Sequence, residues 1–463
     1  MTVGRWLALA ALCGVSGCSS TPARTAATSA EVDERIPSSV ALATFDTVWA
    51  VVKETYVDTV FVNGPWNTVR DSLRQQAMKV TTRSGLDRLL TATLGQIPES
   101  HFYIIPSSVA EDVRADTDEE SAGGTVGLSL RIASGKALVW RVEPGSPAAA
   151  AGLMTGQIVE QVGDRVVSTS LGKVLSLPDA SRQRAFSDLN FKLNRQLTPS
   201  VGDTVRIRLI ETGNNRAVER QLVAVPMRGT VSKFGNLPPI AGVVRSFRHP
   251  VPGLRGGCIG TIAFNIWLPA LAPELQRAVD SVASCAGIVI DLRGNPGGVG
   301  AMVMGFGGFF VESPVSLGTM RMRQLSLNFA INPRVVRAGG TQTGPFKGPV
   351  AILVDAMSAS TSEIFATGMQ RLGRAKVFGQ RSAGAALPAL MHGLPSGDTF
   401  VHAVADFTDP AGGRIEGSGV VPDQLIPLTQ QDLAENIDAP FEAAIKWIAA
   451  AALETAGSSR QKQ

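Results

Sequence analysis

The second half of the chain alternates short apolar runs with stretches of helical periodicity. Residues 259–264, 287–290 and 349–354 are such runs, and each is followed by a helical stretch. Strands that are apolar throughout are buried on both faces, and helices between them are typical of crossovers joining parallel strands. We therefore expect an α/β core with largely parallel strands over residues 228–450.

Two smaller units precede this core. Residues 40–110 begin with apolar side chains at helical intervals, which predicts a helical N-terminal domain. Residues 120–227 combine short strands with a helical stretch over 182–197, which predicts a small, partly open β-barrel with helices. The last residues, 451–463, end in a polar sequence and are expected to form a C-terminal tail.

The chain begins with a targeting pattern. Arg5 precedes an apolar stretch too short to span a bilayer, so we expect a signal peptide over residues 1–17. The phrase Val-Ser-Gly-Cys that ends at Cys18 resembles a bacterial lipobox; the alternative is an ordinary cleavage site beside an incidental cysteine. Lipidation of Cys18 would leave residues 18–39, rich in Ser, Thr, Ala and Pro, as a flexible tether.

Composition excludes several partners. The formal net charge of +4 and the 18% of charged residues provide no dense basic surface, so nucleic acid is not an expected partner. The four histidines are scattered without zinc-ligand spacing, and we expect neither a metal nor a cofactor. Of the four cysteines, Cys258 and Cys285 remain after the signal and lipobox, and an oxidising compartment favours a disulfide between them over two free thiols.

Two phrases lie where strands of the predicted core give way to helices. Asp291–Gly298 (DLRGNPGG) is rich in glycine, so its backbone N–H groups can approach a developing oxyanion. Ser358–Glu363 (SASTSE) follows the strand at 349–354, where a serine can present its hydroxyl at a helix start. Taken alone, the first is an ordinary turn and the second an N-cap.

Two further phrases supply ionisable groups. Glu99-Ser100-His101 ends the helical domain and provides an imidazole, the usual base for activating a serine hydroxyl. Arg414–Asp423 contains Glu416, which by itself could be a surface carboxylate. All four phrases bear on one chemistry, because a serine nucleophile needs a base, a group that orients the base, and oxyanion donors.

In their order along the chain, over residues 45–422, the four phrases resemble those of the carboxy-terminal processing (tail-specific) and tricorn-core serine peptidases. The resemblance implies a core of the ClpP/crotonase type and a nucleophile at Ser360, with Ser358 and Ser362 serving the turn and the helix start. The tricorn-like branch implies a Ser-His-Ser-Glu tetrad, formed here by Ser360 with His101, Ser100 and Glu416. Oxyanion N–H groups would come from Gly297 or Gly298 and from Thr361.

The middle unit resembles a bacterial PDZ domain. The resemblance rests on Glu143–Leu153 (EPGSPAAAAGL) and on Gly156-Gln157, where Gln157 replaces the usual Asp. It implies a loop that binds a peptide's terminal carboxylate, formed by Thr125, Val126, Gly127 and Leu128. The alternative is a PDZ fold that serves only as a packing lid.

One departure from the family bears on the mechanism. The lysine-dyad branch takes its base from a Gly-Lys-Gly phrase, but the corresponding stretch here, residues 379–386, reads GQRSAGAA. Lys376 lies too early to replace that lysine. We therefore expect His101 as the general base, with a rate that rises with pH through the ordinary histidine value of about 6.5.

The expected function is that of a serine endopeptidase acting on envelope or extracytoplasmic proteins or peptides, with recognition of the substrate's C-terminus as one route. The alternative is a catalytically inactive, peptide-binding lipoprotein. Ser19 after the lipobox favours the periplasmic face of the outer membrane in a Gram-negative cell, with the lipid anchor as the membrane contact. The sequence leaves the oligomeric state open.

Overall fold

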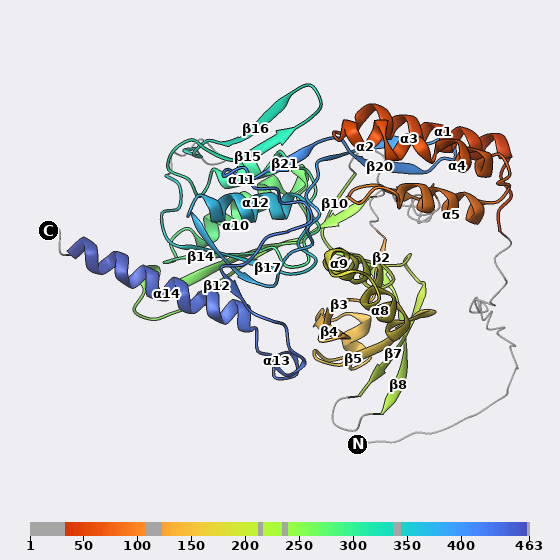
Figure 1. Cartoon of the computed structure of the whole chain (residues 1–463). Coiled ribbons are helices and arrows are strands. Elements are labelled where there is room, and N and C mark those ends of the chain that lie inside the picture. Colours follow the sequence, from red (N-terminus) through yellow and green to blue (C-terminus); the bar gives the residue numbers. More distant parts are fainter. Residues whose placement is uncertain (1–32, 108–122, 212–215, 234–238, 337–343, 461–463) are drawn as a thin grey trace, which may run out of the picture.

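The computed structural model describes residues 33–107, 123–211, 216–233, 239–336 and 344–460. Three units are visible: N-terminal helices, a small β-barrel, and a large α/β core whose last helix, α14, ends at the left of the view (Figure 1). The expected signal segment, Cys18 and the tether up to residue 32 lie outside the described residues.

The N-terminal unit packs its helices around a core that includes Phe45, Val48, Trp66 and Leu90, each fully buried. The Asp58 side chain accepts from the Phe61 N–H and begins the second helix, and Thr82 caps the fifth in the same way. The helices are α1 Ser38–Thr55, α2 Thr59–Asn63, α3 Pro65–Thr68, α4 Arg70–Ala77 and α5 Arg83–Leu94.

The sequence predicted a helical unit, but the structure adds a small β-sheet to the helices. A short strand, β1 Tyr103–Ile105, pairs with β20 Thr399–Ala403, which in turn pairs with β19 Ala389–Gly393. Phe400 and Leu394 complete the core beneath the helices. Helical periodicity could not reveal this sheet, because β1 is short and its partners come from the far end of the chain.

The β-barrel is built on a sheet with the strand order β3-β4-β5-β7-β8. Helix α9 Asp179–Arg195 packs against β3, the edge strand of this sheet. The strands are β2 Gly124–Thr125, β3 Leu128–Ala133, β4 Lys136–Val142, β5 Ile158–Val162, β6 Arg165–Val166, β7 Thr204–Ile210, β8 Ala217–Val223 and β9 Val225–Pro226; the shorter helices are α7 Pro147–Ala150 and α8 Val167–Leu175.

The α/β core has a sheet ordered β12-β13-β14-β17-β18-β22, parallel from β13 to β22. Its strands are β12 Val244–Pro250, β13 Cys258–Phe264, β14 Ile288–Asp291, β17 Val350–Val354, β18 Ala375–Gly379 and β22 Gln424–Leu425. Successive side chains of a strand point to opposite faces. Ile290 therefore packs in the larger cluster with α10 Ala272–Val282, α11 Met302–Gly307 and α12 Thr361–Arg371, while Val289 packs against α14 Ala439–Arg460.

The remaining elements border this sheet. A second sheet of three strands has the order β16-β15-β21, and β10 pairs with β11. These elements are β10 Thr230–Ser232, β11 Ile240–Gly242, β15 Val315–Arg321, β16 Ser326–Ile331, β21 Asp406–Thr408, α13 Gln430–Ala434 and the 3-10 turns Arg255–Gly257 and Pro269–Leu271.

The sequence predicted a C-terminal tail over residues 451–463. In the structure, helix α14 continues through this segment as far as Arg460. The run of alanines and Leu453 before the polar residues has high helix propensity, which the polar composition of the last residues obscured. No helix in the described part of the chain combines the length and apolarity that crossing a bilayer requires.

Cys258 and Cys285 form a disulfide in the structure, with their Cα atoms 4.9 Å apart. Cys258 begins β13 and Cys285 lies just before β14, and the two strands are parallel neighbours. Their starts therefore meet at one edge of the sheet, within the separation that a disulfide requires.

Replacing both cysteines with alanine should destabilise the protein by about 3–4 kcal/mol, because the bond closes a loop of 27 residues in the unfolded chain. The free energy of unfolding, measured by urea denaturation, checks this value. Mass spectrometry that finds both thiols alkylatable after non-reducing denaturation would show instead that the bond is absent.

Candidate active site

Two loops meet at the carboxyl ends of β14 and β17. The Asp355 carboxylate accepts hydrogen bonds from the N–H of Gly294 (2.9 Å) and of Met357 (3.0 Å), which joins the loops. The Ala359 N–H donates to the carbonyl oxygen of Asn295 (3.1 Å) and so joins them again. The glycine-rich loop and the serine-containing loop are thus hydrogen-bonded to each other at the carboxyl ends of the parallel strands. Ligands of α/β proteins bind at this edge of the sheet.

The flanking serines have structural roles. The Ser358 hydroxyl donates to the Leu292 carbonyl oxygen (2.8 Å), and the Ser362 hydroxyl donates to that of Asn295 (3.1 Å). Both side chains are fully buried. This leaves Ser360, which is half-buried, as the serine of the phrase that a ligand can reach.

Ser360 stands immediately before helix α12 with backbone angles φ 55° and ψ −118°. Only four described residues other than glycine have a positive φ, and His101 (60°) is another of them. Such conformations cost of order 1–3 kcal/mol and persist where surrounding contacts fix them. The two residues that sequence reasoning selected as nucleophile and base are therefore both held in strained backbone positions.

The expected oxyanion donors surround Ser360. A Cβ placed on Gly297 would lie 2.7 Å from Ser360 Cβ and 3.0 Å from Thr361 N, so this glycine closely approaches the serine. The Gly297 N–H itself donates to Asn295 Oδ1 (3.0 Å). In the described part of the chain no hydrogen bond occupies the N–H of Gly298 or of Thr361, so these two groups are the available pair.

Gly298 has the backbone angle φ 137°, and a Cβ on it would overlap the carbonyl oxygen of Trp267. Trp267 fixes the loop on that side, since its N–H donates to the Gly297 carbonyl oxygen (2.9 Å) and its carbonyl accepts from Val299 N–H (2.8 Å). Thr361 Oγ1 also donates to the Gly298 carbonyl oxygen (2.9 Å). The peptide plane at Gly298 is thereby held in position.

Ser100, His101 and Glu416 form a hydrogen-bonded chain. The Ser100 hydroxyl donates to Glu416 Oε2 (2.9 Å) and lies 2.7 Å from His101 Nδ1. Because the hydroxyl has a single proton, given to Glu416, it accepts from Nδ1–H of the imidazole. The chain therefore favours the tautomer that leaves His101 Nε2 free to accept a proton.

Glu416 is held by three donors. Its Oε1 accepts from the Ser100 N–H (2.7 Å), and its Oε2 accepts from the Ala386 N–H (2.8 Å) in addition to the Ser100 hydroxyl. A neighbouring ion-pair network ties the same segments together, because Arg414 bonds both Glu99 (2.5 Å) and Asp406 (2.9 Å). The loop from the N-terminal unit is thereby fixed onto the end of the α/β core.

One peptide group connects the two halves of the site. The Ala385 carbonyl oxygen accepts from the Ser360 N–H (2.8 Å), and the adjoining Ala386 N–H donates to Glu416. Ser360 and Glu416 thus lie on either side of a single peptide plane. Among the described residues, no hydrogen bond joins Ser360 directly to His101.

Burial dominates the electrostatics of this site. Loss of water around the imidazole lowers the pKa of His101 to about 4, and the positive charge of Arg184 acts in the same direction. Burial raises the pKa of Glu416, although its three donors oppose the change. The imidazole of His101 is therefore neutral at pH 7, and its pKa lies well below the value of about 6.5 expected from the sequence.

Glu363 is a fully buried carboxylate that sequence reasoning left without a role. Its Oε1 accepts from the Ser382 hydroxyl (2.5 Å) and the Gly384 N–H (2.7 Å), and its Oε2 from the N–H groups of Ala385 (2.9 Å) and Ser360 (3.0 Å). Burial raises its pKa to about 7 against these donors. A signal was present, since a glutamate three residues after a serine at a helix start is a capping-box pattern.

Lys376 does not reach the site. It lies on β18 with its ammonium 5.9 Å from the ring centre of Phe378 and 5.8 Å from that of Trp447 in α14. Helix α14 covers the opposite face of the sheet from α12. The lysine is thereby directed away from Ser360.

The loop expected to bind a peptide carboxylate has little free hydrogen-bonding capacity. The Val126 N–H donates to the Leu197 carbonyl oxygen (3.1 Å), and the Gly127 N–H to Thr125 Oγ1 (2.9 Å). Leu128 pairs with Val142 in the barrel sheet. The arrangement therefore resembles a closed turn more than an open anion cradle.

The free edge of β3 is also occupied. Asn194 of α9 accepts from the Leu130 N–H (2.9 Å) and donates to its carbonyl oxygen (3.0 Å), and Asn190 accepts from the Ile132 N–H (2.9 Å). These are the groups that an added strand would need. A peptide can join β3 in this way only if it displaces the two asparagines.

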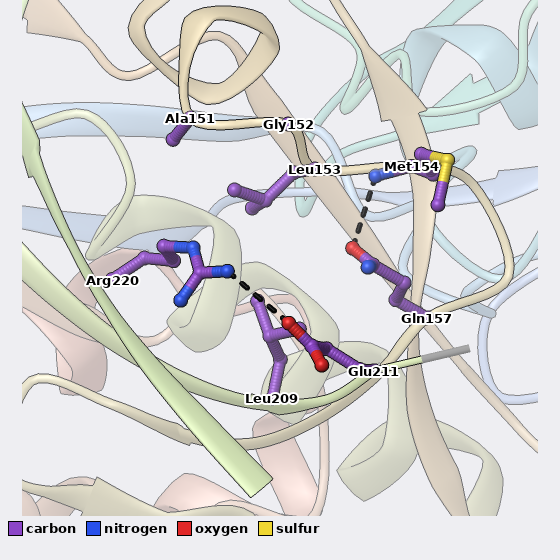
Figure 2. A pocket seen from close by; sticks show the side chains of 8 residues that line it. All are labelled: Ala151, Gly152, Leu153, Met154, Gln157, Leu209, Glu211 and Arg220. Atoms are coloured by element: carbon purple, nitrogen blue, oxygen red, sulfur yellow. Dashed lines mark hydrogen bonds and ion pairs between the residues drawn. The ribbon is translucent and has the colours of Figure 1, made fainter. Parts of the chain in front are cut away.

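Gln157, which stands where the resemblance suggested Asp, bonds its own turn. Figure 2 shows its side-chain oxygen accepting from the Met154 N–H (2.9 Å), near the Arg220–Glu211 ion pair (3.3 Å) on the barrel surface. The glutamine thus supplies the acceptor that a carboxylate would have supplied.

In the part of the chain that is described, no three His, Cys, Asp or Glu side chains are grouped so that they could hold a metal ion.

Comparison with known proteins identifies the class. Residues 259–426 match the model of peptidase family S41. The α/β core is a serine peptidase domain. This core is similar to peptidase family S41, and the chain is similar over most of its length to carboxyl-terminal-processing proteases.

A relative that spans most of the chain is the carboxyl-terminal-processing protease of Picosynechococcus sp., 21% identical over 385 residues, covering 82% of this chain and 81% of the relative. Among solved structures, the photosystem II D1 C-terminal processing protease matches with a TM-score of 0.56 and 20% identity, covering 85% of this chain and 96% of that one. Mature CPAF matches with a TM-score of 0.58 and 12% identity, covering 90% and 98%. At these identities the two structures support the mixed α/β fold.

Proposed function

We propose that the protein is an endopeptidase of the tricorn-like branch, with Ser360 as nucleophile and His101 as general base. The observation that carries this proposal is the hydrogen-bonded chain from Glu416 through Ser100 to His101. That chain fixes a neutral imidazole with Nε2 available, which is what a serine nucleophile requires of its base.

In the proposed reaction, Ser360 Oγ attacks the carbonyl carbon of the scissile peptide bond while its proton moves to His101 Nε2. The N–H groups of Gly298 and Thr361 stabilise the negative oxygen of the tetrahedral intermediate, and the dipole of α12 adds to them. The imidazolium then gives its proton to the leaving amine. A water molecule, deprotonated by His101, then attacks the acyl carbon. The bond from that carbon to Ser360 Oγ breaks, and the imidazolium returns its proton to Oγ as the carboxylic acid leaves.

A peptide-library digest tests this function directly. The intact protein should cleave internal peptide bonds, and the Ser360→Ala variant should cleave none above background. The competing candidate is an inactive lipoprotein that binds peptides on the same fold. It predicts peptide binding by both proteins and cleavage by neither.

The pH dependence follows from the lowered pKa of His101. A general base acts when it is deprotonated, so the titration of His101 should lower kcat/KM only as the pH approaches 4. A change near pH 7 is assigned to Glu363, because burial raises the pKa of this carboxyl to about 7 and it accepts from the Ser360 N–H. Protonation of Glu416 adds to the loss at low pH, because a protonated carboxyl no longer fixes the imidazole tautomer. A kcat/KM profile with one acid limb centred near pH 6.5 and no activity left below it would contradict the lowered pKa of His101.

The barrel is proposed to be a PDZ-like module. Its strand order and the closeness of α9 to the β3 edge support this assignment. Because Asn190 and Asn194 occupy that edge, we expect replacement of both by alanine to increase the affinity of the Ser360→Ala protein for peptides that add a strand. Unchanged affinity in a fluorescence anisotropy titration would favour a barrel that only packs on the core.

The envelope location remains a proposal that rests on the sequence around Cys18. We expect the mature protein to begin at a lipidated Cys18 and to face the periplasm from the outer membrane. Cys18→Ser should release the protein from the membrane fraction to the soluble fraction, as judged by cell fractionation and immunoblotting. Retention of the variant in the membrane would disprove the anchor, and Cys13→Ser serves as the matched control.

A further inference from the structure

A cavity of about 480 Å³ lies between the barrel and the α/β core. Its barrel side includes Leu128 and Ser129 at the start of β3. Its core side includes Gly294, Pro296 and Met357, which belong to the two loops around Ser360. A peptide that extends from the barrel toward the proposed nucleophile would therefore pass along this cavity.

The lining is rich in arginine. Five arginines line the cavity, against two carboxylates, Glu143 and Asp291; the arginines are Arg131, Arg141, Arg228, Arg245 and Arg293. Unequal numbers of opposite charges in a partly enclosed site attract ligands of the minority sign.

Three of these arginines have their own carboxylates. Arg131 bonds Asp355 (2.6 Å), Arg245 bonds Glu143 (3.2 Å), and Arg293 bonds Asp291 (2.8 Å) and Asp438 (2.7 Å). The pairs of Arg131 and Arg293 with Asp355 and Asp291 are buried, with side-chain exposures of 4–9%. The charges of these three arginines are therefore already paired with carboxylates of the protein.

Arg141 and Arg228 have no carboxylate within ion-pair distance among the described residues. The guanidinium of Arg141 lies over the Trp140 ring, 4.5 Å from its centre, and the charged groups that act on it are Asp291, Arg293, Arg245 and Arg131. Asp291 attracts it from beyond hydrogen-bond distance, but both oxygens of Asp291 accept from Arg293. Burial lowers the pKa of Arg141, as expected for a cation that lacks a bonded counter-ion.

We propose that this cavity selects substrates by a peptide carboxylate, which Arg141 binds with Arg228 as a second cation. A planar guanidinium can take a carboxylate through two parallel hydrogen bonds, and stacking on Trp140 holds its plane in place. The carboxylate is that of an Asp or Glu side chain within the substrate, which distinguishes this site from one that binds the C-terminus of a peptide. The inference rests on the proposed peptidase function and names its substrate class.

Binding to the full-length Ser360→Ala protein tests the proposal without any need for cleavage. The probes are fluorescein-labelled peptides of one sequence, with Glu or Gln at the internal positions and with a free or amidated C-terminus. We expect the best Glu-bearing peptide to bind about 10- to 100-fold more tightly than its Gln counterpart, whether the C-terminus is free or amidated. A preference that follows the Glu side chain supports the proposal, and a preference that follows only the free C-terminus contradicts it.

Variants of Arg141 then assign the effect. Arg141→Gln should remove the preference for the carboxylate, and Arg141→Lys, which keeps the charge but not the planar fork, should retain part of it. Arg206→Gln is the matched control, since Arg206 lies on β7 of the same barrel outside the cavity lining, with 56% of its side chain exposed. Equal binding of charged and neutral peptides, or a preference that survives Arg141→Gln, would overturn the proposal.

The outcome is separable from the proposed catalytic function. If the preference is present and wild-type protein still cleaves nothing, the peptidase assignment fails while the carboxylate site stands. If wild-type protein cleaves charged and neutral peptides with equal kcat/KM, the carboxylate site fails while the peptidase assignment stands. Because the wild-type comparison uses peptide variants alone, it remains decisive even if Arg141→Gln impairs folding.

Discussion

Replacing His101 with alanine should lower the rate of peptide hydrolysis by at least about 10³-fold, whereas Lys376→Ala should leave it near the wild-type value. Loss of a general base typically costs about 10²–10⁴-fold, and more where base and nucleophile act as a unit. His101 is held by Ser100 and Glu416 in a tautomer that can accept a proton, whereas Lys376 lies against aromatic rings on the other face of the sheet.

The measurement is kcat/KM on a peptide identified in the library digest, for both variants beside Ser360→Ala. Circular dichroism and thermal unfolding of each variant establish that it is folded. Near-normal hydrolysis by His101→Ala together with an inactive Lys376→Ala would reverse the assignment and support a lysine base.

Glu363→Gln should both destabilise the protein and impair hydrolysis, although it changes one atom. The two carboxylate oxygens accept four hydrogen bonds, and an amide turns one of these oxygens into a donor facing two other donors. Each buried donor left without an acceptor costs about 1–3 kcal/mol, so we expect a loss of about 2–5 kcal/mol in the free energy of unfolding. Since Ser360 N–H and Ala385 N–H are among the donors, the position of Ser360 should change as well.

Urea denaturation and kcat/KM measured on the same samples check this prediction. Glu54→Gln is the matched control, because Glu54 is an exposed residue of α1 and its replacement should change neither quantity. A Glu363→Gln protein with wild-type stability and rate would mean that the carboxylate is protonated and already acts as a donor in the native state.

The sequence predicted the α/β core and the disulfide-bearing strands because both depend on local patterns. Ile288, Val289 and Ile290 form an uninterrupted apolar run, and a strand buried on both faces by α12 and α14 requires such a run. The sheet of β1, β19 and β20 was not predicted, because its strands are short and far apart in the sequence. The helix at 451–460 was missed for a different reason, as polar composition outweighed helix propensity.

Some features of the candidate site could likewise be predicted from the sequence, and others could not. The resemblance of four sequence motifs to those of a peptidase family selected Ser360, His101, Ser100 and Glu416. The structure brings the last three into one hydrogen-bonded chain. The choice between Gly297 and Gly298 could not be made from the sequence, because it depends on the bond from Gly297 N–H to Asn295. The lowered pKa of His101 could not be predicted from the sequence either, because it depends on how deeply the imidazole is buried once the N-terminal unit packs on the core.

Active-site labelling tests the central claim most directly. Full-length protein treated with a fluorophosphonate at pH 7 should carry one covalent adduct, which peptide mapping by mass spectrometry assigns to Ser360. Labelling should be absent in Ser360→Ala and much slower in His101→Ala, because the imidazole activates the hydroxyl. Failure of the wild-type protein to react, or an adduct on a serine other than Ser360, would contradict the account.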